Sequence, residues 1–316
     1  MINNFLQSTA NDSTSIINAA PITGELCSRW VQYLDAKPKT IQTYTRNIKP
    51  FMEYLHLNGI THPTRDDIIA YREQIKATHK PTTTQAYIQA IKLFFQWLEQ
   101  EGLYTDIAKH IKGAKLDTDH KKDPLTAKQA AQLLSSINTS SLTGKRDYAI
   151  ISLMITSGLR TIEIIRANIE DIRNIGDFTA LFIQGKGHDE KNTYIKLAEP
   201  VEKAIRSYLK ARGKAPAAAP LFVSHAHRND GERLTTRSIS RLAKENLKAA
   251  GYDSERLTAH SFRHTAATLN LLNGATIEET QQLLRHTNIN TTMIYAHALE
   301  RANNNSETRI ANTIFG

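Results

Sequence analysis

The sequence predicts a mainly α-helical protein with a small β-sheet, divided into two domains. Apolar residues recur at helical spacing through the first third of the chain, and no strand pattern interrupts them. Further along, two short strand-like runs flank a polar turn and predict one hairpin. A charged stretch without an apolar stripe, at residues 112–124, reads as a linker between the two parts. A length of 316 residues suits about two domains, and 40% apolar residues can supply a core for each.

The first domain is expected to be a bundle of four helices over residues 22–111. The preceding residues, 1–21, are rich in Asn, Ser and Thr and predict a mobile arm. Apolar stripes at spacings of three and four mark the core face of each helix. Helix by helix, these stripes are Leu26, Trp30 and Leu34; Ile41, Tyr44, Ile48, Phe51 and Leu55; Ile68, Tyr71 and Ile75; and Tyr87, Ile91, Phe94 and Leu98.

The opposite faces of two of these helices carry hydroxyl groups, amides and cations. Such groups contact phosphates and base edges in DNA, although a solvated surface would use similar residues. The candidates are Thr40, Thr43, Arg46 and Lys49 on one helix and Thr83, Gln85 and Lys92 on another.

The second domain, residues 125–316, is expected to open with helices at 126–137 and 148–156. Gly158 tolerates the left-handed backbone that ends a helix, so the next helix should start at Arg160. That position favours a bound phosphate, because the backbone N–H groups at a helix N-terminus are free. Glu163, one turn later, could hold the guanidinium of Arg160 by a hydrogen bond.

The rest of the second domain begins with the hairpin, whose strands are predicted at residues 178–184 and 193–197 around the tip G-K-G-H-D-E-K-N. A helix at 236–250 carries Arg237 and Arg241 four residues apart, and both are candidates for contacts to a nucleic-acid backbone. Three short helical stretches follow. They carry His260 and Arg263 at the start of the first, His286 at the end of the second and Tyr295 after T-T-M-I in the third.

Composition favours a polyanionic partner, although charge alone would equally suit a basic, soluble protein without one. The formal net charge is +9 and the pI is near 9.5, and Lys and Arg that neutralise phosphates supply affinity without sequence preference. The single cysteine, Cys27, excludes an internal disulfide and a cysteine-based metal cluster. We expect no secretory signal and no membrane segment, and therefore a cytoplasmic protein.

Several of these polar residues together suit a phosphodiester. Guanidinium forks meet paired phosphate oxygens with two hydrogen bonds each, so Arg160, Arg263 and a histidine could form a clamp. Tyr295 can act as a nucleophile and Lys186 as an acid. His260 and His264 are four residues apart, but the Glu of H-E-x-x-H is missing, so no metal is expected. The G-K-G turn also lacks the spacing of a nucleotide-binding P-loop.

The order of these motifs resembles that of the tyrosine recombinases, or phage integrase family. The motifs are S-G-L-R-T-I-E, G-K-G, H-S-F-R, and a histidine followed nine residues later by a tyrosine. The resemblance covers most of the chain and implies a helical core-DNA-binding domain followed by an α/β catalytic domain. It also implies six catalytic residues, which are Arg160, Lys186, His260, Arg263, His286 and Tyr295. Within the hairpin tip, Lys191 is the alternative to Lys186.

The chemistry that the resemblance implies is a transesterification without metal, cofactor or water. Tyr295 would form a 3′-phosphotyrosine while Lys186 protonates the departing 5′ oxygen. The substrate would be double-stranded DNA, bound by a dimer at each site and by four subunits in the synapse. The apolar tail with Ile310, Ile314 and Phe315 would dock on a neighbouring subunit.

The resemblance leaves some choices open. It suggests a Xer-like recombinase or a mobile-element integrase, with relaxation by a type IB topoisomerase or DNA binding without catalysis as alternatives.

One position departs from the family pattern, since Arg285 stands before His286 where glycine is usual. Arginine prefers a right-handed or extended backbone, which bears on how the chain enters His286. We expect activity to survive, because a charged side chain at this position can point to DNA.

Overall fold

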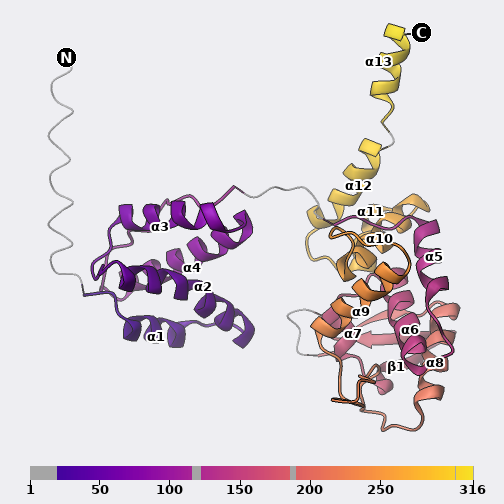
Figure 1. The fold of residues 1–316 in the computed structure, drawn as a ribbon. Coiled ribbons are helices and arrows are strands. Elements are labelled where there is room, and N and C mark those ends of the chain that lie inside the picture. Colours follow the sequence, from indigo (N-terminus) through magenta and orange to yellow (C-terminus); the bar gives the residue numbers. More distant parts are fainter. Residues whose placement is uncertain (1–19, 116–121, 186–189, 303, 316) are drawn as a thin grey trace. The chain divides into compact units, whose positions relative to one another are not determined.

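The computed structural model describes residues 20–115, 122–185, 190–302 and 304–315 (Figure 1). By its contacts the chain divides into two compact units, residues 1–119 and 120–316, and each is considered by itself. The predicted fold class is confirmed, because the described part is mostly helical and contains a small sheet. Residues 1–19, most of the expected arm, lie outside the described residues, as do 116–121 of the expected linker.

Four helices form the first unit: α1 Gly24–Tyr33, α2 Pro38–Leu57, α3 Arg65–Thr78 and α4 Pro81–Gln100. Prolines open α2 and α4, where their missing N–H has no helical partner to lose. The predicted stripes face a shared core that includes Trp30, Phe51 and Phe94, each at most 1% exposed. Burial of these aromatic rings, rather than helix propensity alone, therefore holds the bundle together.

The second unit contains helices, a short 3₁₀ turn and three strands. In chain order they are α5 Ala127–Ser136, α6 Leu142–Ser157, α7 Thr161–Arg166, η1 Ile169–Asp171, β1 Ile172–Ile175, β2 Phe178–Ile183, β3 Thr193–Lys196, α8 Glu199–Arg212, α9 Thr236–Ala249, α10 Ala259–Leu272, α11 Ile277–Leu284, α12 Asn290–Ala302 and α13 Ser306–Phe315.

Helix α6 is the central element of this unit. It is buried from Ala149 to Ile155 without interruption, and α8 and α10 both pack against it. A helix that is apolar on all sides must be surrounded, which explains why its last turn can position residues in the interior.

The sheet is antiparallel in the order β1-β2-β3, with Leu181 opposite Ile172 on one side and Ile195 on the other. Leu181, Ile183 and Ile195 join the core of the unit. The ends of β2 and β3 that meet at Ile183 and Thr193 are therefore fixed beside the helices.

Strand β1, helices α8 and α13 and the 3₁₀ turn η1 were not predicted, and two elements are longer than expected. Strand β1 has the sequence I-R-N-I, which is too short and polar for a strand pattern. Helix α8 does carry a helical stripe, Val201, Ile205 and Tyr208, that could have revealed it. Helix α6 begins six residues before the predicted start, and α12 continues past Tyr295 to Ala302. Among the described residues, no helix is both long and apolar enough to cross a membrane.

Candidate active site

The site begins at the turn between α6 and α7. Gly158 ends α6 in the left-handed conformation, with φ of 59°. A Cβ at this position would lie 2.7 Å from Cδ2 of Leu284, so glycine satisfies both the backbone and the packing. The chain then places Arg160 as the N-terminal cap of α7, as the sequence predicted.

Glu163 holds Arg160 in place. Its carboxylate accepts hydrogen bonds from the backbone N–H of Arg160 at 2.8 Å and from Nη1 of its guanidinium at 3.0 Å. The Glu163 side chain is fully buried, whereas that of Arg160 is 27% exposed. The guanidinium of Arg160 is thus held by the buried carboxylate on one side and is accessible to solvent on the other.

Arg263 joins two turns of the chain through hydrogen bonds to backbone carbonyl groups. From the first half of α10, its guanidinium donates to the carbonyl oxygens of Gly158 and Leu284. Burial, together with the charges of Arg160 and Arg285, lowers the pKa of Arg263 to about 9. The group remains a cation at neutral pH, and its position depends on the turns after α6 and α11.

His286 follows α11 and lies beside the arginines. Its Nδ1 is 2.9 Å from the hydroxyl of Thr292. Burial and the charges of Arg263, Arg160 and Arg285 lower the pKa of His286 to about 4. The imidazole is therefore neutral at pH 7, with one ring nitrogen left to face the cavity.

Tyr295 lies on α12 and is 7% exposed. Its ring packs with Ala267 and Leu284, and its centroid is 5.3 Å from that of His264. Burial raises the pKa of Tyr295, while the charges of Arg263 and Arg160 oppose that rise. The phenol is accordingly protonated at neutral pH and needs a base before it can attack.

His260 is exposed, one turn before Arg263 on α10. Partial burial of the ring and the charges of Arg263, Lys122 and Arg160 lower its pKa. A neutral imidazole can accept a proton, so this histidine suits a general base.

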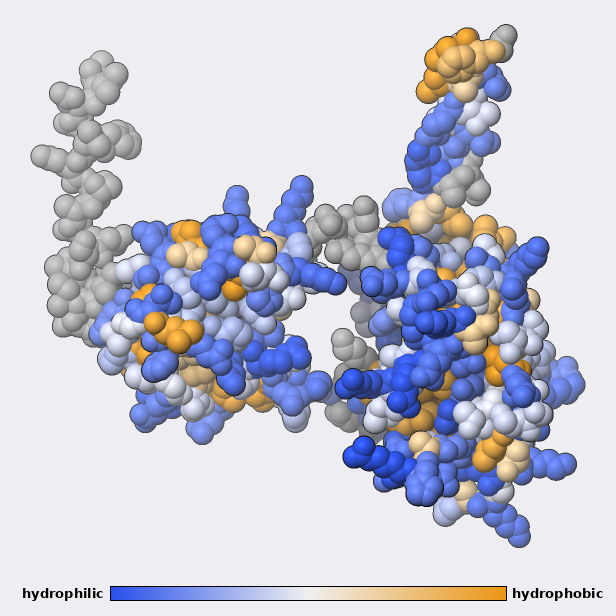
Figure 2. All heavy atoms as spheres, in the orientation of Figure 1, coloured by the Kyte–Doolittle hydropathy of each residue, from blue (hydrophilic) through white to orange (hydrophobic). Residues whose placement is uncertain are grey.

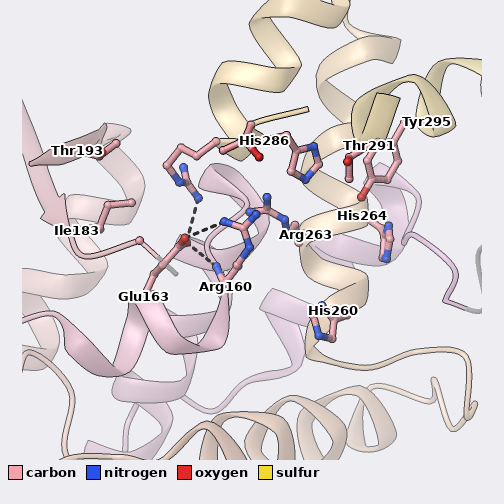
Figure 3. A pocket seen from close by; sticks show the side chains of 13 residues that line it. Arg160, Glu163, Ile183, Thr193, His260, Arg263, His264, His286, Thr291 and Tyr295 are labelled. Carbon is pink, nitrogen blue, oxygen red and sulfur yellow. Dashed lines mark hydrogen bonds and ion pairs between the residues drawn. The ribbon is translucent and has the colours of Figure 1, made fainter. Parts of the chain in front are cut away.

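These side chains surround one cavity of about 450 Å³. Figure 3 shows Arg160, Arg263 and His286 turned toward the same space, with Tyr295 and His264 along one side and His260 below. The structure thus brings together five of the six predicted residues. Lys186 lies outside the described residues, although Gly185 before it lines the cavity. The alternative is Lys191, whose Nζ donates a hydrogen bond to Oδ2 of Asp171 at 2.5 Å. Lys191 does not line the cavity.

Arg285 differs from its expectation in two respects. Its backbone is left-handed, with φ of 54°, and it ends α11 as a glycine would. This conformation costs a residue with a side chain about 1–3 kcal/mol. The side chain points inward rather than to a free surface, and Nη2 donates to the carboxylate of Glu163 at 3.1 Å. The sequence offered no sign of this pairing, because the two residues are 122 positions apart.

The predicted DNA-contacting residues do not line this cavity. Thr40, Arg46 and Lys49 on α2 are exposed, as are Arg237 and Arg241 on α9. Thr43 and, on α4, Thr83, Gln85 and Lys92 are half-buried. Arg237 and Arg241 line a second, open hollow together with Arg228. Contacts of these residues to DNA remain predictions.

The part of the chain that the structure describes contains no group of three or more His, Cys, Asp or Glu residues able to hold a metal ion. The cavity instead gathers guanidinium and imidazole groups around a single carboxylate, Glu163. Such a set of side chains is suited to an anion.

Residues 123–301 match the phage integrase family, and residues 28–102 match its N-terminal SAM-like domain. The chain belongs to the phage integrase family. This assignment confirms the resemblance found in the motifs.

Relatives within this family carry recombinase names. The chain is 36% identical over 176 residues to tyrosine recombinase XerC of Caldanaerobacter subterraneus subsp. tengcongensis, covering 55% of this chain and 46% of the relative. It is 32% identical over 195 residues to XerC of Chlamydia caviae, covering 62% and 60%. These matches therefore span only about half to three-fifths of the relatives. Tyrosine recombinase XerD of Staphylococcus saprophyticus is 27% identical over 266 residues, covering 82% and 87%.

Solved structures of integrases share the fold. XerH recombinase bound to its palindromic difH substrate, in a post-cleavage complex, has a TM-score of 0.69 at 20% identity, covering 95% of this chain and 91% of that one. A lambda integrase dimer bound to a COC′ core site has a TM-score of 0.67 at 18% identity, covering 84% and 95%. At this identity the likeness establishes the phage integrase fold and no more.

Proposed function

We propose that this protein is a site-specific DNA recombinase that cleaves and rejoins strands through a 3′-phosphotyrosine intermediate. The observation that carries the proposal is the cavity in which Arg160, Arg263 and His286 surround a space beside Tyr295. Two guanidinium groups and a neutral imidazole can donate to the non-bridging oxygens of one phosphodiester. A protonated phenol at the same space supplies the nucleophile.

The proposed reaction exchanges one phosphate ester for another. The phenol oxygen of Tyr295 bonds to phosphorus, the bond from phosphorus to the 5′ oxygen breaks, and the 3′ side stays attached to the protein. His260 receives the phenol proton, and Lys186 gives a proton to the departing 5′ oxygen. The ester bond is conserved, so the 5′ hydroxyl of another strand can reverse the step without ATP or a cofactor.

The pKa values of the site support these roles. The phenol of Tyr295 is a poor nucleophile because burial raises its pKa, so it needs a base and nearby cations. The lowered pKa of His260 leaves it neutral and able to take the proton. Arg160 and Arg263 then face the charge that develops on the phosphate, and loss of one such donor typically costs about 10²-fold or more in rate.

The remaining parts of the chain fit the same proposal. Residues 22–111 would hold the DNA opposite the catalytic domain of residues 125–316, with residues 112–124 as the linker. Assembly would be a dimer on each site and a tetramer in the synapse, and the cytoplasm would be the compartment. The XerC, XerD, XerH and lambda proteins named above are recombinases or integrases, and nothing in them favours the topoisomerase alternative.

A covalent-trapping experiment tests the proposal. Purified protein is incubated in EDTA with double-stranded oligonucleotides that carry a randomised core, and protein–DNA adducts are isolated and sequenced. We expect one enriched sequence, and an adduct on a nicked duplex of that sequence that resists boiling in detergent. Tyr295→Phe should abolish the adduct, because it removes only the attacking oxygen.

The matched control is Tyr194→Phe, which alters a 47% exposed tyrosine on β3 outside the cavity. That variant should form the adduct at the wild-type rate. An adduct that persists in Tyr295→Phe would place the nucleophile elsewhere, and the absence of any adduct with wild-type protein would overturn the proposal.

A further inference from the structure

Arg285 combines three features that stability alone does not explain. It is one of two residues other than glycine with positive φ in the described part of the chain, the other being His110. Its guanidinium is largely withdrawn from solvent, with the side chain 14% exposed. Its Nε is also buried without a hydrogen-bond partner. Glycine at this position would avoid all three costs, so the side chain must be understood from what it contacts.

The contacts of Arg285 lead to the proposed catalytic groups. Nη2 donates to Oε2 of Glu163 at 3.1 Å, and Nη1 donates to the carbonyl oxygen of Leu283 at 2.6 Å. Glu163 is fully buried, and its other oxygen accepts from Nη1 of Arg160 at 3.0 Å. Figure 3 shows dashed lines that meet at the carboxylate of Glu163, and these include its hydrogen bond from Arg160.

This geometry connects two ends of the site. Arg160 caps α7, and Arg285 ends α11 immediately before His286. A carboxylate shared by two guanidinium groups has less freedom to rotate than one held by a single partner. Restraining the Glu163 carboxylate therefore restrains the guanidinium of Arg160. The ion pair between Arg285 and Glu163 also restrains the turn immediately before His286.

We propose that Arg285 is a positioning residue for strand cleavage, acting through Glu163 on the guanidinium of Arg160 and on the turn before His286. This inference rests on the proposed recombinase function. It assigns to Arg285 no contact with the DNA itself.

The test measures single-turnover cleavage of the nicked duplex selected above, with the full chain. Arg285→Gly removes the guanidinium and also relieves the left-handed backbone, so any loss of rate cannot come from strain. We expect cleavage to fall about 10- to 100-fold, which is the range typical of residues that orient a catalytic group. Arg206→Ala, which alters an exposed arginine on α8 paired with Glu202, is the control and should cleave within about twofold of wild type.

A double-mutant cycle separates positioning from direct contact. Glu163→Gln removes the charge through which Arg285 is proposed to act, so adding Arg285→Gly to it should change the rate by less than about threefold. If the two effects multiply instead, Arg285 acts independently of Glu163 and the assignment is wrong. A wild-type rate in Arg285→Gly would also overturn it, while normal cleavage by wild type would leave the recombinase proposal standing.

A second readout does not depend on activity. Arg285 is one of the charged groups that lower the pKa of His286, and the others facing that ring are Arg263, Arg160 and His264. By histidine NMR of the free protein, we expect this pKa to rise above its wild-type value of about 4 in Arg285→Gly and to stay low in Arg285→Lys, which keeps the charge. An unchanged pKa in Arg285→Gly would show that the guanidinium does not act on the His286 ring and would contradict the proposal.

Discussion

At the residue scale, the hydroxyl of Thr292 can determine which ring nitrogen of His286 carries the proton. Thr292 is fully buried on α12, and its hydroxyl lies 2.9 Å from Nδ1 of His286. Because the pKa of His286 is about 4, the ring carries one proton at neutral pH. A hydroxyl that donates to Nδ1 leaves this proton on Nε2, from where it can be donated to a phosphate oxygen.

The corresponding prediction concerns Thr292→Val, which keeps the shape of the side chain and removes the hydroxyl. We expect single-turnover cleavage to fall about 10-fold or more, because the proton is no longer held on the nitrogen that faces the cavity. Thr292→Ser, which restores a hydroxyl, should recover most of the rate. Equal cleavage by the valine and serine variants would show that Thr292 only fills space.

At the scale of elements, the turn between α6 and α7 is the position where three elements of the second unit meet. Gly158 lets α6 end directly before Arg160, and its carbonyl oxygen accepts a hydrogen bond from Arg263. Cδ2 of Leu284, at the end of α11, lies 2.7 Å from the position that a Cβ on Gly158 would take. Three elements therefore meet at a position with no room for a side chain.

Gly158→Ala should lower the free energy of unfolding by about 1–3 kcal/mol, through both the left-handed backbone and the clash with Leu284. The matched control is Gly176→Ala, since Gly176 has a similar φ of 54° but nothing within 4 Å of its added Cβ. The difference between the two variants isolates the clash. Circular dichroism is the suitable probe, because both tryptophans, Trp30 and Trp97, lie in the first unit. Equal destabilisation by the two substitutions would rule out the packing contribution.

At the scale of the whole molecule, helix α13 presents an apolar surface to solvent. Ile310, Ile314 and Phe315 are 59%, 65% and 86% exposed, and Figure 2 shows hydrophobic residues gathered on this C-terminal helix. No described residue of α13 is buried. An exposed apolar patch of this kind is typical of a surface that another chain covers.

We therefore predict that Ile314→Asp weakens assembly on DNA while leaving the binding of one subunit intact. A charge on this surface opposes burial against a neighbour but lies far along the sequence from the proposed DNA-contacting residues. Native gel shifts on duplexes with one or two binding sites should show unchanged single occupancy and at least about 10-fold weaker double occupancy. The control is Arg309→Asp, which replaces a polar residue of the same helix and changes the net charge by more than Ile314→Asp does. Equal loss in both variants would indicate an effect of net charge rather than of the apolar surface.

The sequence by itself determined the helical stripes of the first unit, the glycine that ends α6, and the types and order of the proposed catalytic residues. These features are local, because a helix repeats every 3.6 residues and a left-handed turn needs glycine at one position. Strand β1 escaped prediction because I-R-N-I is too short and polar to show a strand pattern, although its partner β2 follows after only Gly176 and Asp177.

The order of the motifs predicted that Arg160 and Tyr295 serve one site, and the tertiary structure shows both lining one cavity although they are far apart in the chain. The tertiary structure alone revealed that Arg285 lines the same cavity and donates a hydrogen bond to Glu163. The physical reason is that contacts between side chains more than a hundred residues apart depend on how the helices pack around α6. Such packing produces no periodic pattern in the sequence from which the contacts could be predicted.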